Sequence, residues 1–421
     1  MRRALYSLLL HVLAPGAVLY LWWRGRRQPA YRHHIGERFG RYRLTAVPTR
    51  PIWVHAVSVG ETRAAEPLLL ALRRRHPDRA ILLTSTTPTG RATGEELFGG
   101  KVQQVYLPYD LPFAVSSFLD RFDPAVGVLM ETELWPNLAA ACRRRGIPLY
   151  LANARLSARS ARGYGRFASL ARDVLAGLAG VGAQTAADAG RLEALGARHP
   201  VVTGNLKFDI APAPAMVALG RELRQRFGAH RPVLLAASTR EGEEEIVLDA
   251  WPGACPEGTL LVIVPRHPQR FDDVAMLLDR RGIRWQRRSA VGAVAGDIAV
   301  VLGDSMGEMT AYYGASDVAF VGGSLLPLGG QNLIEACAMG VPVLIGPHTF
   351  NFEEATALAI DAGAARRIAD GPAMVTAAAS LLGDKAARER MSAAALGFAA
   401  AHRGATARTL ALIESGWLPP R

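Results

Sequence analysis

Short, almost continuously apolar runs alternate with amphipathic segments along most of this chain, from Pro51 to Ile345. Strands that are buried on both faces lose the usual alternation of polar and apolar residues, and a parallel sheet covered by helices buries strands in this way. The pattern therefore predicts an α/β fold. The predicted strands are 52–57, 80–84, 102–106, 126–130, 149–152, 180–183 and 201–203, then 233–237, 260–264, 299–302, 318–321 and 343–345.

A proline-rich stretch divides this pattern into two halves. The sequence Ala-Pro-Ala-Pro at 211–214 indicates a linker. A chain of 421 residues is long enough for two domains of ordinary size. We therefore expect two Rossmann-like, doubly wound domains facing a cleft, at 28–210 and 211–421, the second ending in an alanine-rich helical segment. Ligands of such sheets bind beyond the carboxyl ends of the strands.

Residues 1–27 form a separate apolar segment. The run Ala4–Trp23 carries no formal charge and is flanked by arginines, and about 20 apolar residues suffice to cross a bilayer. His11, Pro15 and Gly16 interrupt the run, so a helix that spans the bilayer and a helix that lies in its interface both remain open. The excess of arginine after the segment places the body of the protein on the cytoplasmic face.

The composition limits the partners of this chain. Its net charge of +12 favours polyanions, including an anionic membrane surface, but the sequence holds no nucleic-acid-binding motif, so we expect no nucleic acid partner. The three cysteines are far apart, which argues against a disulfide framework or a zinc site. No dinucleotide-binding or P-loop glycine motif follows a strand, which argues against a dehydrogenase and a P-loop ATPase. We expect no bound metal, because a D-x-D motif is absent.

The second half carries several candidate anion-binding loops at predicted strand ends. Gly322–Ser324 follows one strand, and 328–332 precedes a helix that holds Glu335. Glycines before a helix let the backbone approach a phosphate, and the helix start offers free N–H donors. Arg266 closes another strand between two prolines and can pair a phosphate, while 303–308 follows a further strand. Each feature alone has a plain structural explanation, but together they favour a nucleotide pocket.

The first half supplies carboxylates at its strand ends. Glu61 begins the helix that follows the first strand, where it can act as a general base toward an acceptor hydroxyl. Glu131 and Glu133 follow another strand, and Lys207 precedes the linker, where it can stabilise negative charge. A helix-start acid stabilised by the helix dipole and an exposed loop lysine are the plain alternatives.

The motifs taken together, in this order, resemble the 3-deoxy-D-manno-octulosonic acid (Kdo) transferases of lipopolysaccharide assembly. The matching stretches cover nearly the whole chain. They are YRHHIGERFGRY, HAVSVGET, LPYDLP, METELWPN, NARLSARS, TGNLKFD, VPRHPQRF, GDSMGE, FVGGS, GGQNLIEA and GPHTFNF.

This resemblance implies a GT-B glycosyltransferase fold and an inverting, metal-independent transfer of Kdo from CMP-Kdo to a lipid A precursor of the lipid IVA type. It implies an acceptor-binding first domain, a donor-binding second domain, no cofactor, and a place on the cytoplasmic face of the cell inner membrane. By the same resemblance Glu61 is the catalytic base, and Glu131 and Lys207 support the transition state. The CMP-binding residues implied are Pro265, Arg266, Met306, Gly307, Glu308, Asn332, Leu333, Ile334 and Glu335.

Three other functions remain as alternatives. A transferase that uses a uridine diphosphate sugar would have the same fold but a different donor. A nucleotide-sugar epimerase would share the fold but turn over without an acceptor. A basic nucleic-acid binder on a membrane tether would bind DNA or RNA with a steep salt dependence.

Overall fold

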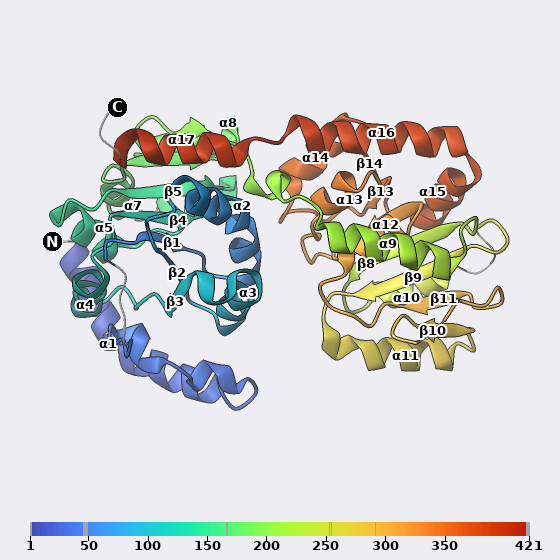
Figure 1. The fold of residues 1–421 in the computed structure, drawn as a ribbon, viewed down its shortest axis with the longest axis horizontal. Coiled ribbons are helices and arrows are strands. Elements are labelled where there is room, and N and C mark those ends of the chain that lie inside the picture. Colours follow the sequence, from blue (N-terminus) through green and yellow to red (C-terminus); the bar gives the residue numbers. More distant parts are fainter. Residues whose placement is uncertain are drawn as a thin grey trace. The chain divides into compact units, whose positions relative to one another are not determined.

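A computed structural model describes residues 2–44, 49–165, 167–251, 253, 255–290 and 292–417 of the chain (Figure 1). The contacts divide it into two units: residues up to Ile210 together with those from Arg403 onward form the first, and Ala211–His402 form the second. Each unit contains one seven-stranded parallel sheet with helices. The predicted α/β class with two parallel sheets is confirmed.

The first sheet has the strand order β3-β2-β1-β4-β5-β6-β7. Its strands are β1 Ile52–His55, β2 Ile81–Ser85, β3 Gln103–Tyr106, β4 Val126–Met130, β5 Leu149–Ala154, β6 Gly180–Ala183 and β7 Val201–Val202. The helices of this unit are α1 Arg2–Arg24, η1 Pro29–Arg32, η2 Ile35–Phe39, α2 Val59–Arg75, α3 Pro88–Phe98, η3 Gly99–Lys101, α4 Pro112–Phe122, α5 Pro136–Arg144, α6 Ala158–Gly165, α7 Ala168–Leu175, α8 Ala186–Ala194, η4 Leu206–Asp209 and α17 Ala405–Trp417.

The second sheet has the strand order β10-β11-β9-β8-β12-β13-β14. Its strands are β8 Val233–Thr239, β9 Leu260–Pro265, β10 Trp285–Arg287, β11 Val300–Leu302, β12 Val318–Val321, β13 Val343–Ile345 and β14 Ala365–Arg367. The helices of this unit are α9 Pro214–Phe227, α10 Glu243–Ala250, η5 Pro268–Arg270, α11 Phe271–Arg280, α12 Met309–Gly314, α13 Ile334–Ala338, α14 Glu353–Asp361, α15 Gly371–Gly383 and α16 Lys385–Ala401.

Burial on both faces explains the continuous apolar runs of the sequence. In β1, Trp53 belongs to one hydrophobic cluster, whereas Ile52 and Val54 belong to another. Successive side chains of a strand point to opposite faces of the sheet, so the two clusters lie on its two sides. All three side chains are fully buried, and no polar face is left on this central strand.

The last helix belongs to the first unit, whereas every residue after 210 was predicted to lie in the second domain. Ala405 and Ile413 of α17 are fully buried in a hydrophobic cluster of the first unit. The carboxylate of Asp209 accepts hydrogen bonds from the backbone N–H groups of Gly404 (2.7 Å) and Thr406 (2.5 Å). Figure 1 shows this helix, in red, against the first unit.

Candidate active site

The first sheet reverses its winding between β1 and β4. The chain adds β2 and β3 on one side of β1 and β4 to β7 on the other, so β1 and β4 are neighbours at the switch point. Ligands of open parallel sheets bind at the carboxyl ends of the strands at such a point. Glu61 follows β1 and Glu131 follows β4, so the fold brings both predicted acids to this position.

Glu61 lies in the first turn of α2, half-buried, with both carboxylate oxygens hydrogen-bonded. One oxygen accepts from the backbone N–H of Val57 (2.8 Å) and the other from the hydroxyl of Ser58 (3.1 Å). The pKa of Glu61 is raised to about 7, chiefly by burial. The nearby carboxylates of Glu131 and Glu133 also raise it, whereas the two hydrogen bonds lower it. A carboxylate with this pKa accepts and releases protons near neutral pH, as a general base must.

Glu131 and Lys207 form a loose ion pair beside this carboxylate. The Nζ atom of Lys207 lies 3.9 Å from Oε1 of Glu131. The backbone of Glu131 is left-handed (φ 55°), and its N–H donates to the carbonyl of Ala152 in β5 (2.9 Å). Left-handed backbone is uncommon for residues other than glycine and costs free energy that the surrounding structure must offset.

Asn153 supports this pair from the end of β5 and was not among the residues predicted from the sequence. It is fully buried, its backbone is also left-handed (φ 54°), and its Oδ1 accepts from the N–H of Leu206 (3.0 Å). Asn205 Oδ1 in turn accepts from the N–H of Lys207 (3.0 Å). Two asparagine side chains therefore fix the short η4 turn that carries Lys207. The only sign of this position in the sequence is an asparagine directly after the predicted strand 149–152, since asparagine tolerates a left-handed backbone.

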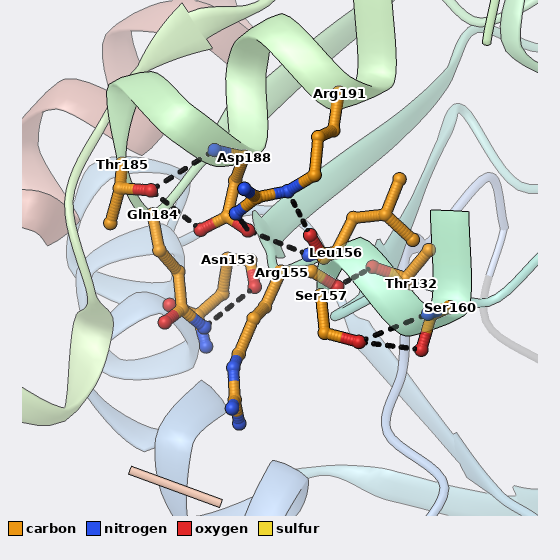
Figure 2. Close-up of polar contacts among 10 residues, drawn as sticks. All are labelled: Thr132, Asn153, Arg155, Leu156, Ser157, Ser160, Gln184, Thr185, Asp188 and Arg191. Atoms are coloured by element: carbon orange, nitrogen blue, oxygen red, sulfur yellow. Dashed lines mark hydrogen bonds and ion pairs between the residues drawn. The ribbon is translucent and has the colours of Figure 1, made fainter. Parts of the chain in front are cut away.

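The loop after β5 is also held firmly to its neighbours (Figure 2). The Thr132 hydroxyl donates to the carbonyl of Arg155, which joins the loop after β4 to the loop after β5. The buried Asp188 accepts from the N–H of Leu156 (2.8 Å), and Arg191 donates to the carbonyl of Leu156. Figure 2 shows the side chain of Arg155 pointing away from this network.

His55 also lies at the end of β1, but it is a weak proton acceptor. It is fully buried, and its Nδ1 lies 2.8 Å from the Thr84 hydroxyl. Burial lowers the pKa of His55 to about 3, so the ring is neutral at physiological pH and accepts no proton there. Glu61 therefore remains the group at this strand end whose pKa suits proton transfer.

The switch point of the second sheet, between β8 and β12, is filled by a carboxylate of the protein itself. Glu243 is fully buried. Its oxygens accept from the backbone N–H groups of Arg240 (2.9 Å), Gly323 (2.5 Å), Ser324 (2.9 Å) and Leu325 (3.0 Å). The expectation that the glycine-rich loop after β12 offers free N–H groups to a phosphate is therefore wrong, because Glu243 already occupies them.

The loop before α13 is likewise bonded within the protein. The N–H groups of Gly330 and Gln331 donate to the carbonyls of Gly323 (2.6 Å) and Gly322 (3.0 Å), so they are not the free donors predicted from the glycine pattern. Asn332 Nδ2 donates to Glu335 Oε1 (2.9 Å), which holds these two predicted CMP-binding side chains together. The other two predicted residues of this stretch, Leu333 and Ile334, are buried.

Arg266 and Pro265 lie at the end of β9, as predicted. The N–H of Arg266 donates to the carbonyl of Thr239 in β8 (2.9 Å), and its side chain is half-buried. The pKa of His267 is lowered by the partial desolvation of its ring and, in addition, by the positive charges of Arg240 and Arg266. Cationic side chains from the ends of two adjacent strands therefore gather at this edge of the second sheet.

The segment after β11 contains the remaining predicted donor-binding residues. Met306 is 52% exposed, and Gly307 has a left-handed backbone (φ 79°). Glu308 accepts from Arg288 Nη2 (2.9 Å) and from the Ser305 hydroxyl (2.5 Å). No sequence pattern pointed to Arg288, which follows the short edge strand β10 and reaches Glu308 only in the folded protein.

Comparison with known proteins identifies the family. Residues 33–210 match the family model described as 3-Deoxy-D-manno-octulosonic-acid transferase (kdotransferase). The chain is 48% identical to the 3-deoxy-D-manno-octulosonic acid transferase of Bordetella pertussis, over 99% of this chain and 100% of the relative. It is 37% identical to the enzyme of the same description from Haemophilus influenzae, over 98% of each.

Solved structures support the fold. The UDP-GlcNAc 2-epimerase of Neisseria meningitidis superposes with a TM-score of 0.59 over 87% of this chain and all of that chain, at 16% sequence identity. A likeness at this identity concerns the two-sheet fold alone, which is of the GT-B type. The near full-length identity to the curated relatives is the stronger finding, and from it the chain belongs to the 3-deoxy-D-manno-octulosonic acid (Kdo) transferase family.

Proposed function

We propose that this Kdo transferase moves Kdo from CMP-Kdo to a lipid A precursor of the lipid IVA type, by inverting transfer with Glu61 as general base. The observation that carries the proposal is the position of Glu61. It lies at the switch point of the first sheet, with a pKa of about 7. Family membership supports the transfer chemistry, and the carboxylate supplies the proton acceptor that an attacking hydroxyl needs.

The proposed reaction is a single displacement. Glu61 takes the proton of an acceptor sugar hydroxyl as the oxygen attacks the anomeric carbon of Kdo. The bond between that carbon and the phosphate oxygen of CMP breaks, and CMP leaves as an anion. Lys207, held 3.9 Å from Glu131, supplies a positive charge near the reacting groups, and Glu131 keeps that charge in place.

The second unit is proposed to hold the donor. Arg266 and its cationic neighbours at the ends of β8 and β9 suit the phosphate of CMP. Asn332, Glu335 and Glu308 offer polar side chains for the ribose and base. Leu333 and Ile334 are buried, so we assign them a supporting role through the backbone. Side-chain cations can stabilise the leaving phosphate, so we propose that the reaction needs neither metal nor cofactor.

The protein is proposed to work at the cytoplasmic face of the inner membrane. Within the part of the chain that the structure describes, only α1 is long and apolar enough to cross a bilayer, by length and composition. A lipid-linked acceptor with phosphate groups suits both this helix and the positive net charge.

Mass spectrometry of the lipid product tests the proposal. The purified full chain is incubated with a lipid IVA-type acceptor and CMP-Kdo, in the presence and absence of a chelator, and in parallel with uridine diphosphate sugars. The expected product is the acceptor enlarged by Kdo, formed from CMP-Kdo alone and equally with the chelator. Transfer from a uridine diphosphate sugar only, or turnover of the donor without acceptor, would overturn the proposal.

A further inference from the structure

One face of the helix α1 is partly buried in the first unit, and the rest of the helix is exposed. The partly or fully buried side chains recur at helical spacing, and they are Tyr6, Ser7, Leu10, Ala14, Ala17, Val18 and Leu21. The remaining face is apolar and about half or more exposed at each position, and it comprises Leu5, Leu8, Leu9, Val12, Leu13, Leu19, Trp22 and Trp23. A helix with this division is attached to the protein on one side and has an apolar surface to cover on the other.

The amino-terminal part of α1 is held by α4 and α5 (Figure 1). The Ser7 hydroxyl lies 3.0 Å from Oδ1 of Asn137, the second residue of α5. Asn137 is itself fixed, because its backbone N–H and its Nδ2 both donate to Asp110, at 2.9 Å and 2.6 Å. One turn further along α1, the rings of His11 and Phe113 lie 6.0 Å apart.

The carboxyl-terminal part of α1 is held by the same unit. Arg32 of η1 donates to the carbonyl of Trp22 (3.1 Å), and Leu21 is buried. The segment then continues into η2, where Glu37 accepts from the N–H of Tyr106 at the end of β3 (2.8 Å). Both ends of the helix are therefore fixed to one folded body.

We infer that α1 lies in the plane of the membrane interface and does not span the bilayer. A helix of this length is roughly 35 Å long, so a spanning orientation would place its two ends on opposite sides of the hydrocarbon core. The contacts of Ser7 and Arg32 would then draw α4, α5 and η1 into that core. In the interfacial orientation, the exposed leucines enter the acyl region while Trp22, Trp23 and the flanking arginines meet the headgroups.

The partner of this face is an anionic lipid leaflet. Arg3 lies before the apolar run and Arg24, Arg26 and Arg27 lie after it, so positive charge borders the apolar surface at both ends. The inference rests on the membrane location proposed above and adds an orientation to it. Asn137 follows the loop that carries Glu131, so the leaflet lies next to that loop, and a lipid acceptor reaches the site while its acyl chains stay in the bilayer.

Depth-dependent quenching tests the orientation. Single cysteines at Leu5→Cys, Val12→Cys and Leu19→Cys, in a Cys255→Ser background, carry an environment-sensitive fluorophore on the full chain. The protein is bound to vesicles of phosphatidylethanolamine and phosphatidylglycerol that contain lipids with a nitroxide at a shallow or a deep position. We expect all three probes to respond alike, with stronger quenching by the shallow nitroxide. Deep quenching at residue 12 with shallow quenching at residues 5 and 19 would show a spanning helix and overturn the inference.

Cross-linking tests the attachment of the amino-terminal end. The double variant Ser7→Cys, Asn137→Cys is treated with a short bifunctional thiol reagent while bound to the same vesicles. We expect an internal bridge that changes the electrophoretic mobility and is absent from each single variant. If both thiols react with a monofunctional reagent and no bridge forms, α1 is not attached as described. Neither readout depends on Kdo transfer, so a failure here would leave the proposed function standing.

Discussion

Replacing the proposed base, Glu61→Gln, should lower Kdo transfer by at least two orders of magnitude and at the same time stabilise the first unit at pH 8. The pKa of Glu61 in the folded protein is about 7, against an ordinary value of 4.5. The folded state therefore disfavours the ionised form. The contribution of the Glu61 carboxyl group to the free energy of unfolding is therefore full below pH 4.5 and is lost as the pH rises to about 7.

The magnitude follows from the pKa difference. At about 1.36 kcal/mol per pKa unit, ionised Glu61 destabilises the folded state by at most about 3 kcal/mol above pH 7, and by less than about 1 kcal/mol at pH 5. A glutamine removes this charge and keeps both contacts, because it can accept from the N–H of Val57 and donate to the Ser58 hydroxyl. The variant should therefore be more stable at pH 8 and nearly equal to the wild type at pH 5.

Thermal unfolding and transfer assays measure the two effects. Thermal unfolding is monitored by tryptophan fluorescence. The unfolding midpoint of a unit of this size shifts by about 2–4 °C per kcal/mol, so a rise of several degrees is expected at pH 8. Loss of a general base should lower transfer by about 10²–10⁴-fold. Glu66→Gln is the matched control, because Glu66 is another α2 glutamate whose pKa is raised by burial. It should retain transfer. A Glu61→Gln protein that is less stable than wild type at pH 8, or that transfers Kdo within tenfold of the wild-type rate, would refute the reasoning.

Further predictions concern the charges around the site. The rate of the chemical step should fall about tenfold per pH unit below 7, because only ionised Glu61 accepts the proton; a flat profile between pH 5 and 7 would contradict this. Lys207→Met and Asn153→Gly should each lower kcat without changing the affinity for CMP. In the Lys207→Met background, Asn153→Gly should lower kcat little further. If the fold-losses of the two single variants multiply in the double variant, Asn153 does not act through Lys207. Arg266→Ala should weaken CMP binding by about tenfold or more in calorimetry, since hydrogen bonds to charged groups contribute about 1.5–3 kcal/mol, and unchanged affinity would remove its phosphate role. Glu243→Gln should lower the unfolding temperature of the second unit, because a carboxylate that accepts several backbone N–H groups is lost; an unchanged midpoint would show that these bonds contribute nothing.

The sequence predicted the central strands well because burial on both faces leaves a plain signal. Residues 126–130, 180–183, 318–321 and 343–345 form strands with the predicted bounds. The two strands that were missed, Trp285–Arg287 and Ala365–Arg367, are short edge strands rich in polar residues. An edge strand buries only part of its surface, so its composition resembles that of a loop.

The candidate site was predictable in part for a similar reason. Strands that run parallel end at the same edge of a sheet, so Glu61 and Glu131 could be placed together from their positions after apolar runs. The role of Glu243 could not be predicted from the sequence, because glutamate is common in a first helical turn. Its partner Gly323 is 80 residues away in sequence. Long-range hydrogen bonds of this kind leave no local pattern, and the same holds for Arg288 and Glu308.

The inclusion of α17 in the first unit affects how the protein is made. The second unit is one continuous stretch, Ala211–His402, whereas the hydrophobic cluster of the first unit is complete only with Ala405 and Ile413. Domains usually fold as they leave the ribosome, the amino-terminal one first. In this protein the second unit can complete its fold first. The first unit can complete its fold only after α17, at the end of the chain, has been translated. Until then the apolar side chains that Ala405 and Ile413 cover in the first unit stay exposed.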